Sequence, residues 1–221
     1  MASAAQALPS TGKAALPVNQ RGLLTVGIMG ATIIQILDTT IANVALPHMQ
    51  TSLGGTVETI TWVLTSYIVA SAVAIPLTGW LASRVGSRQL FLIAVGGFIL
   101  ASMLCGIATN LTEMVLFRMF QGVCGAFIAP LAQTAILDIN PPEKQGSAMS
   151  IWGMCIMVGP ILGPIVGGFL TENYDWRWCF YVNLPIGAIT FAILWFLLPG
   201  RPPQKRPFDA FGFAMMALAL A

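Results

Sequence analysis

The amino-acid sequence predicts an all-α integral membrane protein. Hydrophobic residues make up 57% of its 221 residues and charged residues only 8%, whereas about a quarter of the residues in soluble domains are charged. A soluble domain of this size could not cover its surface with so few charges. Apolar stretches of roughly 20 residues, each long enough to cross a bilayer as a helix, recur along the chain. We therefore expect several membrane-spanning helices packed as a bundle.

The first 21 residues differ from the rest of the chain. They are small and polar, and they lack the continuous apolar core of a secretory signal peptide. We expect a flexible cytoplasmic tail over residues 1–21, followed by a six-span domain over residues 22–199. The predicted spans are Leu23–Leu46, Ile60–Leu81, Leu90–Ala108, Met114–Leu137, Ala148–Leu170 and Phe180–Leu198.

Two segments follow the six spans. Residues 200–210 are rich in proline and basic residues, and we expect them to form a cytoplasmic linker. Residues 211–221, FGFAMMALALA, are apolar but too short to cross a bilayer. We interpret them as the start of a seventh span, and the chain as the N-terminal half of something longer.

Basic residues predict the orientation of the spans. With a cytoplasmic N-terminus, eight basic residues lie inside, Arg177 lies outside and Arg118 lies within a span. This asymmetry between short loops is the positive-inside pattern. The formal net charge of +2 follows from the topology, so we expect no nucleic-acid partner. The eight inner residues are Lys13, Arg21, Arg84, Arg88, Lys144, Arg201, Lys205 and Arg206.

The cysteines and the single histidine do not form a metal-binding pattern. Cys105, Cys124, Cys155 and Cys179 fall in or at the edge of four different spans, with no CxxC spacing. We interpret them as small apolar packing residues. The sequence also contains no phosphate-binding loop, no dinucleotide-binding glycine motif and no nucleophile elbow. We expect no metal, no cofactor and no enzymatic activity.

Two charged side chains, Asp38 and Arg118, fall inside predicted spans. A charge near the middle of a span costs roughly 2.5–3.5 kcal/mol on insertion scales, so it usually faces a partner or a cavity. From the helical rise, Asp38 lies about 12 Å and Arg118 about 7 Å below the outer surface. At these depths the two can pair or share one water-filled cavity. We interpret them as proton-coupling residues; a buried ion pair that only fixes helix packing is the alternative.

Polar and aromatic side chains near this pair predict a substrate cavity. Several share a helical face with Asp38 or lie beside Arg118, and aromatic rings can contact aromatic or cationic compounds. The small residues that flank them suit a cavity wall, and they also suit close helix packing. The candidate cavity residues are Gln35, Thr39, Asn43, Gln121, Tyr67 and Trp62.

Residues 159–168, GPILGPIVGG, place four glycines and two prolines inside a long apolar run. Glycine is a poor helix former and proline removes a backbone donor, so their presence needs a structural reason. We expect another helix to pack closely on this face and the prolines to bend the helix. The two adjacent stripes are Gly159, Gly163 and Gly167, and Pro160, Pro164 and Gly168.

Motifs in a fixed order resemble the EmrB/QacA group, the fourteen-span drug:proton antiporters of the major facilitator superfamily. LDTTIANVALP (37–47) resembles the first-span motif, and GWLASRVGSR (79–88) resembles the loop motif between spans two and three. RMFQGVCGA (118–126) is similar to the fourth-span motif, and GPILGPIVGG to the fifth-span antiporter motif. WRWCFYVNLPIG (176–187) and FDAFG (208–212) also resemble this group.

The loop motif departs from the family pattern at two positions. Ser83 stands where the family carries Asp, and Ser87 replaces a basic residue. A conformational latch built on that Asp is therefore in doubt for this chain. We expect turn and packing roles for the glycines and an anchoring role for the arginines. The matching motif residues are Gly79, Arg84, Gly86 and Arg88.

The resemblance implies the N-terminal six-helix bundle of the superfamily, plus the start of a seventh span. It implies a proton-coupled multidrug efflux transporter that exports lipophilic, often cationic, toxic compounds across the inner membrane by alternating access. Asp38 would take up a proton from the outside, and Arg118 would tune it. The GPILGPIVGG motif goes with export, by shaping the contact between the two halves of the transporter. No cofactor is implied, because the proton gradient drives transport.

The resemblance also implies the partners: drugs or other toxic small molecules, protons, membrane lipid, a periplasmic adaptor and an outer-membrane channel. Two alternatives remain open from the residues. One is a proton-coupled uptake carrier of the same fold. The other is a truncated membrane fragment that does not transport.

Overall fold

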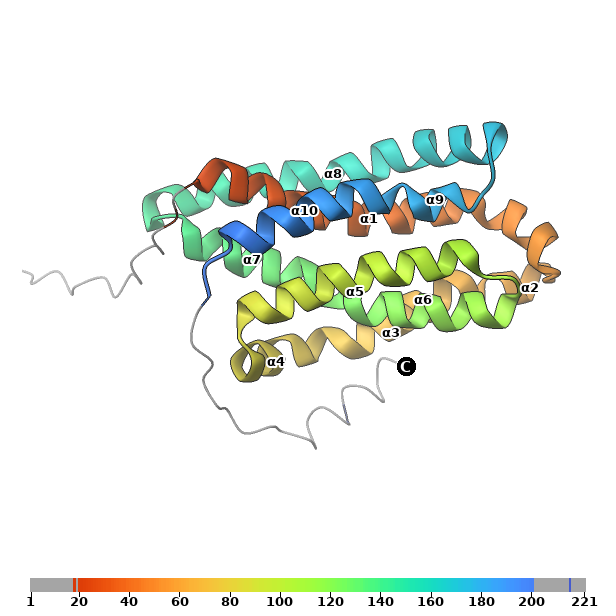
Figure 1. Ribbon diagram of the computed structural model, residues 1–221, viewed down its shortest axis with the longest axis horizontal. Helices are drawn as coiled ribbons and strands as arrows, with labels where there is room; N and C mark the ends of the chain where they lie inside the picture. Colours follow the sequence, from red (N-terminus) through yellow and green to blue (C-terminus); the bar gives the residue numbers. More distant parts are fainter. Residues whose placement is uncertain (1–17, 19, 201–214, 216–221) are drawn as a thin grey trace, which may run out of the picture.

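A computed structural model describes residues 18, 20–200 and 215 of the chain (Figure 1). The predicted tail over 1–21 lies outside the described residues except for positions 18, 20 and 21. The predicted linker over 200–210 and the predicted seventh span over 211–221 also lie outside them, except for Gly200 and Met215.

Regular structure in the described part is entirely helical. Ten α-helices and one short 3-10 helix follow one another along the chain. They are α1 (Arg21–Leu53), α2 (Val57–Ile60), α3 (Trp62–Ala74), η1 (Ile75–Leu77), α4 (Thr78–Val85), α5 (Ser87–Ile107), α6 (Leu111–Ala126), α7 (Ile128–Ile139), α8 (Pro142–Asn173), α9 (Trp178–Tyr181) and α10 (Asn183–Leu197).

Six helical segments of the described chain are long and apolar enough to cross a bilayer, which confirms the predicted all-α fold with six spans. Each segment contains most or all of one predicted span, and most extend it by several residues. The predictions followed hydropathy, whereas a helix continues into polar residues as long as its backbone bonds are made. The segments are Arg21–Leu53, Val57–Val85, Ser87–Ile107, Leu111–Ile139, Pro142–Asn173 and Trp178–Leu197.

Prolines account for interruptions inside three of these segments. Proline has no N–H for the carbonyl four residues before it, and α6 ends at Ala126, four residues before Pro130. In the same way α9 ends at Tyr181, four residues before Pro185. Pro76 lies in η1, between α3 and α4. The two prolines of GPILGPIVGG behave differently, because α8 continues through both of them as one helix.

The long helices lie side by side in an elongated bundle (Figure 1). Helix α1 packs against α8 and α10, α3 packs against α6, and α5 packs against α6 and α10. The start of α1, the α4–α5 turn, the α7–α8 turn and the end of α10 lie at one end of the bundle, on the left in Figure 1. Helix α2, the α5–α6 connection and α9 lie at the other end.

The bundle interior contains two apolar clusters with a polar layer between them. On α1 the first cluster ends with Ile34 and the second begins with Leu37. On α5 the buried residues of the first cluster end with Phe98, and those of the second begin with Cys105. Five of the ten buried polar residues in the described part of the chain lie at this boundary, which places charged groups near the middle of the bundle, away from both ends. They are Asp38, Ser102, Arg118, Gln121 and Asn183.

Candidate functional site

Asp38 on α1 and Arg118 on α6 form an ion pair in the bundle interior. Arg118 Nη1 lies 2.6 Å from Asp38 Oδ2, and each residue is only 1% exposed. The sequence left two arrangements open, a direct pair or a shared cavity. The structure shows the direct pair. Each charge is stabilised by the other, because water does not reach them at this buried position.

Two amide side chains complete the environment of the Asp38 carboxylate. Gln121 Nε2 donates to Asp38 Oδ1 at 2.9 Å, and Asn183 Nδ2 donates to the same oxygen at 2.7 Å. Arg118 Nη1 also donates to Gln121 Oε1 at 2.8 Å. Oδ2 therefore accepts from α6, and Oδ1 accepts from both α6 and α10. Three helices meet at this buried acid.

Asn183 and Ser102 belong to this network and were not among the predicted site residues. The Asn183 amide also donates to Ser102 Oγ at 3.0 Å, and Ser102 donates to the Phe180 carbonyl at 3.0 Å. An amide inside the apolar run of the sixth span was a usable signal, because a polar group there needs a partner. Ser102 gave no such signal, since a single serine in a span satisfies itself easily.

The Arg118 guanidinium is enclosed by aromatic rings as well as by acid. Its central carbon lies 4.8 Å from the Phe180 ring centroid and 5.6 Å from that of Tyr67. Such contacts favour a cation over the ring faces. Its Nε and Nη2 atoms are buried and have no hydrogen-bond partner among the described residues. Arg118 thus has unused donor capacity at the edge of the network.

Two hollows adjoin the network, between α1 and α3. The larger has a volume of about 290 Å³ and includes Gln35, Thr39 and Tyr67 in its lining. The smaller, about 60 Å³, is lined by Thr39, Asn43 and Tyr67 together with Arg118. Thr39, Tyr67 and Ile68 line both hollows. Four of the six predicted cavity residues lie here.

The other two predicted cavity residues lie elsewhere. Gln121 is 0% exposed and is fixed in the Asp38 network, so it faces neither hollow. Trp62 begins α3 and is 56% exposed, outside the lining of both hollows. Its position at a span end is typical of an aromatic residue at the membrane interface.

The small residues that flank Arg118 serve close packing, the alternative that the sequence left open. A Cβ atom on Gly122 would overlap the backbone of Tyr67, and one on Gly125 would crowd Tyr67 and Phe98. Ser71 on α3 donates to the Gly122 carbonyl at 2.9 Å. These contacts bring α3 close to α6, and so bring the Tyr67 ring next to Arg118.

The glycine stripe of GPILGPIVGG is covered by α1. Cβ atoms on Gly159 and Gly163 would overlap Ile36 and Thr40, and Thr40 Oγ1 donates to the Gly159 carbonyl at 3.2 Å. Gly167 lies against α1 in the same way. The stripe therefore packs inside this bundle and is not free for a contact between two halves. The adjacent stripe is the outward one: Pro160 and Pro164 are exposed, and nothing lies near Gly168.

The loop motif lies at the end of the bundle where α4 turns into α5. Gly86 has φ = 100°, a conformation that side chains rarely adopt, so it makes the predicted turn. Gly79 is exposed on α4, and nothing in the described part of the chain lies near the position of its Cβ. Arg84 lies over the Trp80 ring, at 5.4 Å from the centroid.

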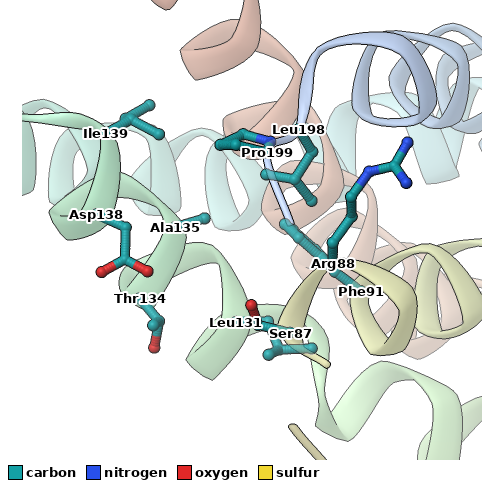
Figure 2. Close-up of a pocket in the computed structure, with 10 residues that line it drawn as sticks. All are labelled: Ser87, Arg88, Phe91, Leu131, Thr134, Ala135, Asp138, Ile139, Leu198 and Pro199. Carbon is teal, nitrogen blue, oxygen red and sulfur yellow. The ribbon is translucent and has the colours of Figure 1, made fainter. Parts of the chain in front are cut away.

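Arg88 reaches across to another helix. Its Nη2 donates to the Trp195 carbonyl at 2.6 Å, in the last turn of α10, where backbone carbonyls lack helical partners. Figure 2 shows the small pocket beside it, between α5, α7 and the residues that follow α10. In that view Arg88 extends away from Asp138. Arg88 thus ties the start of α5 to the end of the sixth span.

Most of the chain matches one known protein family. The sequence profile described as Major Facilitator Superfamily matches residues 28–218, which includes the ion pair, the hollows and the glycine stripe. This chain belongs to that superfamily. It is a multi-pass membrane protein with the all-α fold of superfamily transporters.

Curated relatives of this chain include proteins named for multidrug export and for fatty acid resistance. The chain is 43% identical over 200 residues to "Multidrug export protein EmrB" of Haemophilus influenzae, and 41% identical over 200 residues to that of Escherichia coli. It is 42% identical over 199 residues to "Fatty acid resistance protein FarB" of Neisseria gonorrhoeae. These matches cover 89–90% of the chain but 39% of each relative, so the chain spans about two fifths of their length.

Solved structures of the superfamily support the fold. A peptide transporter superposes with a TM-score of 0.73 over 90% of this chain and 44% of its own, at 17% identity. The inward-open xylose transporter XylE of Escherichia coli superposes with a TM-score of 0.71, over 90% of this chain and 54% of its own, also at 17% identity. At this identity the likeness concerns the arrangement of the helices and not the cargo.

Proposed function

We propose that this chain is the proton-coupling part of a multidrug efflux transporter that exports lipophilic, often cationic, toxic compounds. The observation that carries the proposal is the buried Asp38–Arg118 pair beside an open lining of Gln35, Thr39, Asn43 and Tyr67. Intramembrane charges are expensive and mark transport pathways by default. The resemblance to EmrB and FarB supports export as the direction of transport.

The coupling follows from the charge of the pair. With Asp38 ionised the pair is neutral, and a cationic compound can rest in the hollow beside it. When Asp38 takes a proton, Arg118 keeps its charge without a counter-ion and repels the cation through the wall that it shares with the hollow. The proton and the cargo thus compete without touching the same atom. Alternating exposure of the site to the two sides would turn this competition into exchange.

The aromatic and small residues of the site have consistent roles. Tyr67 lines both hollows and faces Arg118 with its ring, so it offers a flat surface to a lipophilic cargo next to the coupling pair. The glycine stripe holds α8 against α1, the helix that carries Asp38. Movement of α8 relative to α1 therefore changes the position of the helix that carries Asp38.

The proposal also includes the setting in the cell. The basic residues at the ends of the spans favour a cytoplasmic N-terminus. The EmrB resemblance favours the inner membrane, with a periplasmic adaptor and an outer-membrane channel as partners. Proton flow replaces any cofactor.

The test uses the complete reading frame in everted membrane vesicles. Dye or drug accumulation is followed under an imposed pH gradient for the parent protein and for Asp38→Asn. We expect gradient-driven accumulation in the parent and its loss in the variant, because the amide cannot take up a proton. Glu172→Gln is the matched control, since Glu172 is an exposed carboxylate at the end of α8, and it should transport normally.

The possible results separate the roles. Equal accumulation by parent and Asp38→Asn makes the pair a packing element and moves the coupling acid elsewhere. Accumulation by neither protein contradicts the exporter itself. Uptake into right-side-out cells, driven by the gradient, would favour the carrier of the same fold that works inward.

A further inference from the structure

Asp38 Oδ1 is held by two neutral donors, separately from the Arg118 pair. Gln121 belongs to the same helix as Arg118, so its contact adds no new element to the site. Asn183 comes from α10, is 0% exposed, and makes the shorter of the two contacts at 2.7 Å. It is the link between the coupling acid and the sixth span.

Asn183 is itself held in one orientation. Its Nδ2 has two N–H bonds; one points to Asp38 Oδ1 and the other to Ser102 Oγ on α5. Ser102 is fixed in turn because it donates to the Phe180 carbonyl. Asn183 also begins α10 directly after Val182, where the helix is interrupted. The amide nitrogen is thus aimed at the carboxylate by the anchored Ser102 contact and by the start of α10.

We propose that Asn183 is a positioning residue of the coupling site: it holds Asp38 Oδ1, stabilises the ionised acid and ties α1 to α10 as long as the acid is ionised. This inference rests on the proposed function, in which Asp38 carries the proton. A hydrogen bond to the charged form favours that form, and a bond to a carboxylate is about twice as strong as one to a neutral acceptor. Protonation of Asp38 therefore weakens the link to α10.

Other titratable groups also face Asp38, and the test has to separate them from Asn183. Arg118 approaches from α6 and Tyr67 from α3. The thiols of Cys105 on α5 and Cys179 on α9 also lie within electrostatic range of the acid. Helix α8 turns its glycine stripe to α1. All of these groups are unchanged in the variants below.

The experiment follows the protonation of Asp38 directly, by infrared spectroscopy of the purified product of the complete reading frame. The protonated-carboxyl band that is absent in Asp38→Asn reports Asp38, and its intensity is titrated with pH. In Asn183→Leu, which keeps the branched shape of the side chain but removes the donor, we expect half-protonation to move upward by about one pH unit. General loosening of α10 would also move this midpoint, so a control variant on the same helix is needed.

Two further variants make the result specific. Ser102→Ala leaves Asn183 in place but removes its second anchor, so we expect a smaller shift in the same direction; it also serves if Asn183→Leu does not fold. Thr190→Val is the matched control, because Thr190 is buried on α10 and lies against Gly30 of α1. It should titrate like the parent.

Each result decides the inference. An Asp38 midpoint that is unchanged in Asn183→Leu, or unchanged in Ser102→Ala when the first variant does not fold, overturns it. An equal shift in Thr190→Val also overturns it, because general loosening of α10 would then be the cause. The titration requires no transport, so a shifted midpoint in Asn183→Leu stands even if the vesicle test rejects Asp38 as the coupling acid.

Discussion

Arg118 Nη1 and Asp38 Oδ2 lie 2.6 Å apart, although the two residues are 80 positions apart in the chain and belong to α6 and α1. Both are 1% exposed. A pair that is buried to this extent is fixed by the packing of the helices around it, and it makes the stability of the bundle depend on charge balance.

We predict that Arg118→Leu destabilises the bundle by about 3–5 kcal/mol, because it leaves a buried acid without its counter-ion. The double variant Arg118→Leu/Asp38→Asn should recover part of the loss at neutral pH. Denaturant unfolding in detergent, arranged as a double-mutant cycle, measures both effects. Strictly additive effects would show that the pair contributes no coupling energy.

The glycine stripe gives a second prediction. Gly163→Ala should destabilise the protein by about 1–3 kcal/mol, because its Cβ would overlap Thr40 on α1. Gly168→Ala, on the adjacent open stripe of the same helix, should be neutral or stabilising, since alanine is the better helix former. Thermal unfolding of the two variants compares them. Equal melting temperatures would contradict close packing of α8 on α1.

Gly86 gives a third prediction, at the turn between α4 and α5. Gly86→Ala should cost about 1–3 kcal/mol, because φ = 100° is strained for any residue with a side chain. Gly79→Ala is the control from the same loop motif, and we expect no loss because nothing lies near its Cβ. The measurement is unfolding in detergent. A loss in Gly79→Ala and none in Gly86→Ala would reverse the assignment of the turn.

Arg88 gives a fourth prediction, at the end of α10. Arg88→Met should destabilise the protein by about 1 kcal/mol, because the Trp195 carbonyl loses its charged donor. Hydrogen exchange should rise in the last turn of α10 and not in α4. Arg84→Met is the comparison, since Arg84 is exposed and lies over the Trp80 ring of its own helix. Faster exchange in α10 for both variants would indicate a general charge effect.

The hollow beside the pair gives a fifth prediction. In a background without native cysteines, Thr39→Cys should react with a water-soluble maleimide, because Thr39 lines both hollows. Ile34→Cys, on the same helix but fully buried, should not react. A transported compound should slow labelling of Thr39→Cys. Labelling that no transported compound affects would place the cargo elsewhere.

The sequence predicted the spans well because their signal is local. A run of apolar residues long enough to cross a bilayer is recognised as a span from its own residues, without knowledge of the helices that pack against it. The helix interruptions could be predicted for a similar reason, since Pro76 and Pro130 remove particular backbone bonds wherever they stand. The span ends were less accurate, because a helix continues past its apolar core.

The site was predicted only in part. Asp38 and Arg118 were found because a charge in a span is costly on its own account, and Gln35, Thr39 and Asn43 were found by their shared helical face. Asn183 was missed, although its motif had been noticed, because its partner Asp38 lies 145 positions away. Gln121 was placed in the cavity by its helix position, but the neighbouring helices buried it.

Some features of this protein thus follow from the sequence alone, and others follow only from the tertiary structure. The sequence by itself determined the class of protein, its six spans and the presence of a buried acid and base, because these follow from composition and from energies that each residue carries alone. Only the tertiary structure decided that the two charges pair directly, that Asn183 joins them, and that the glycine stripe faces α1. Those contacts depend on which helices become neighbours, and the packing of side chains across the whole bundle fixes that choice.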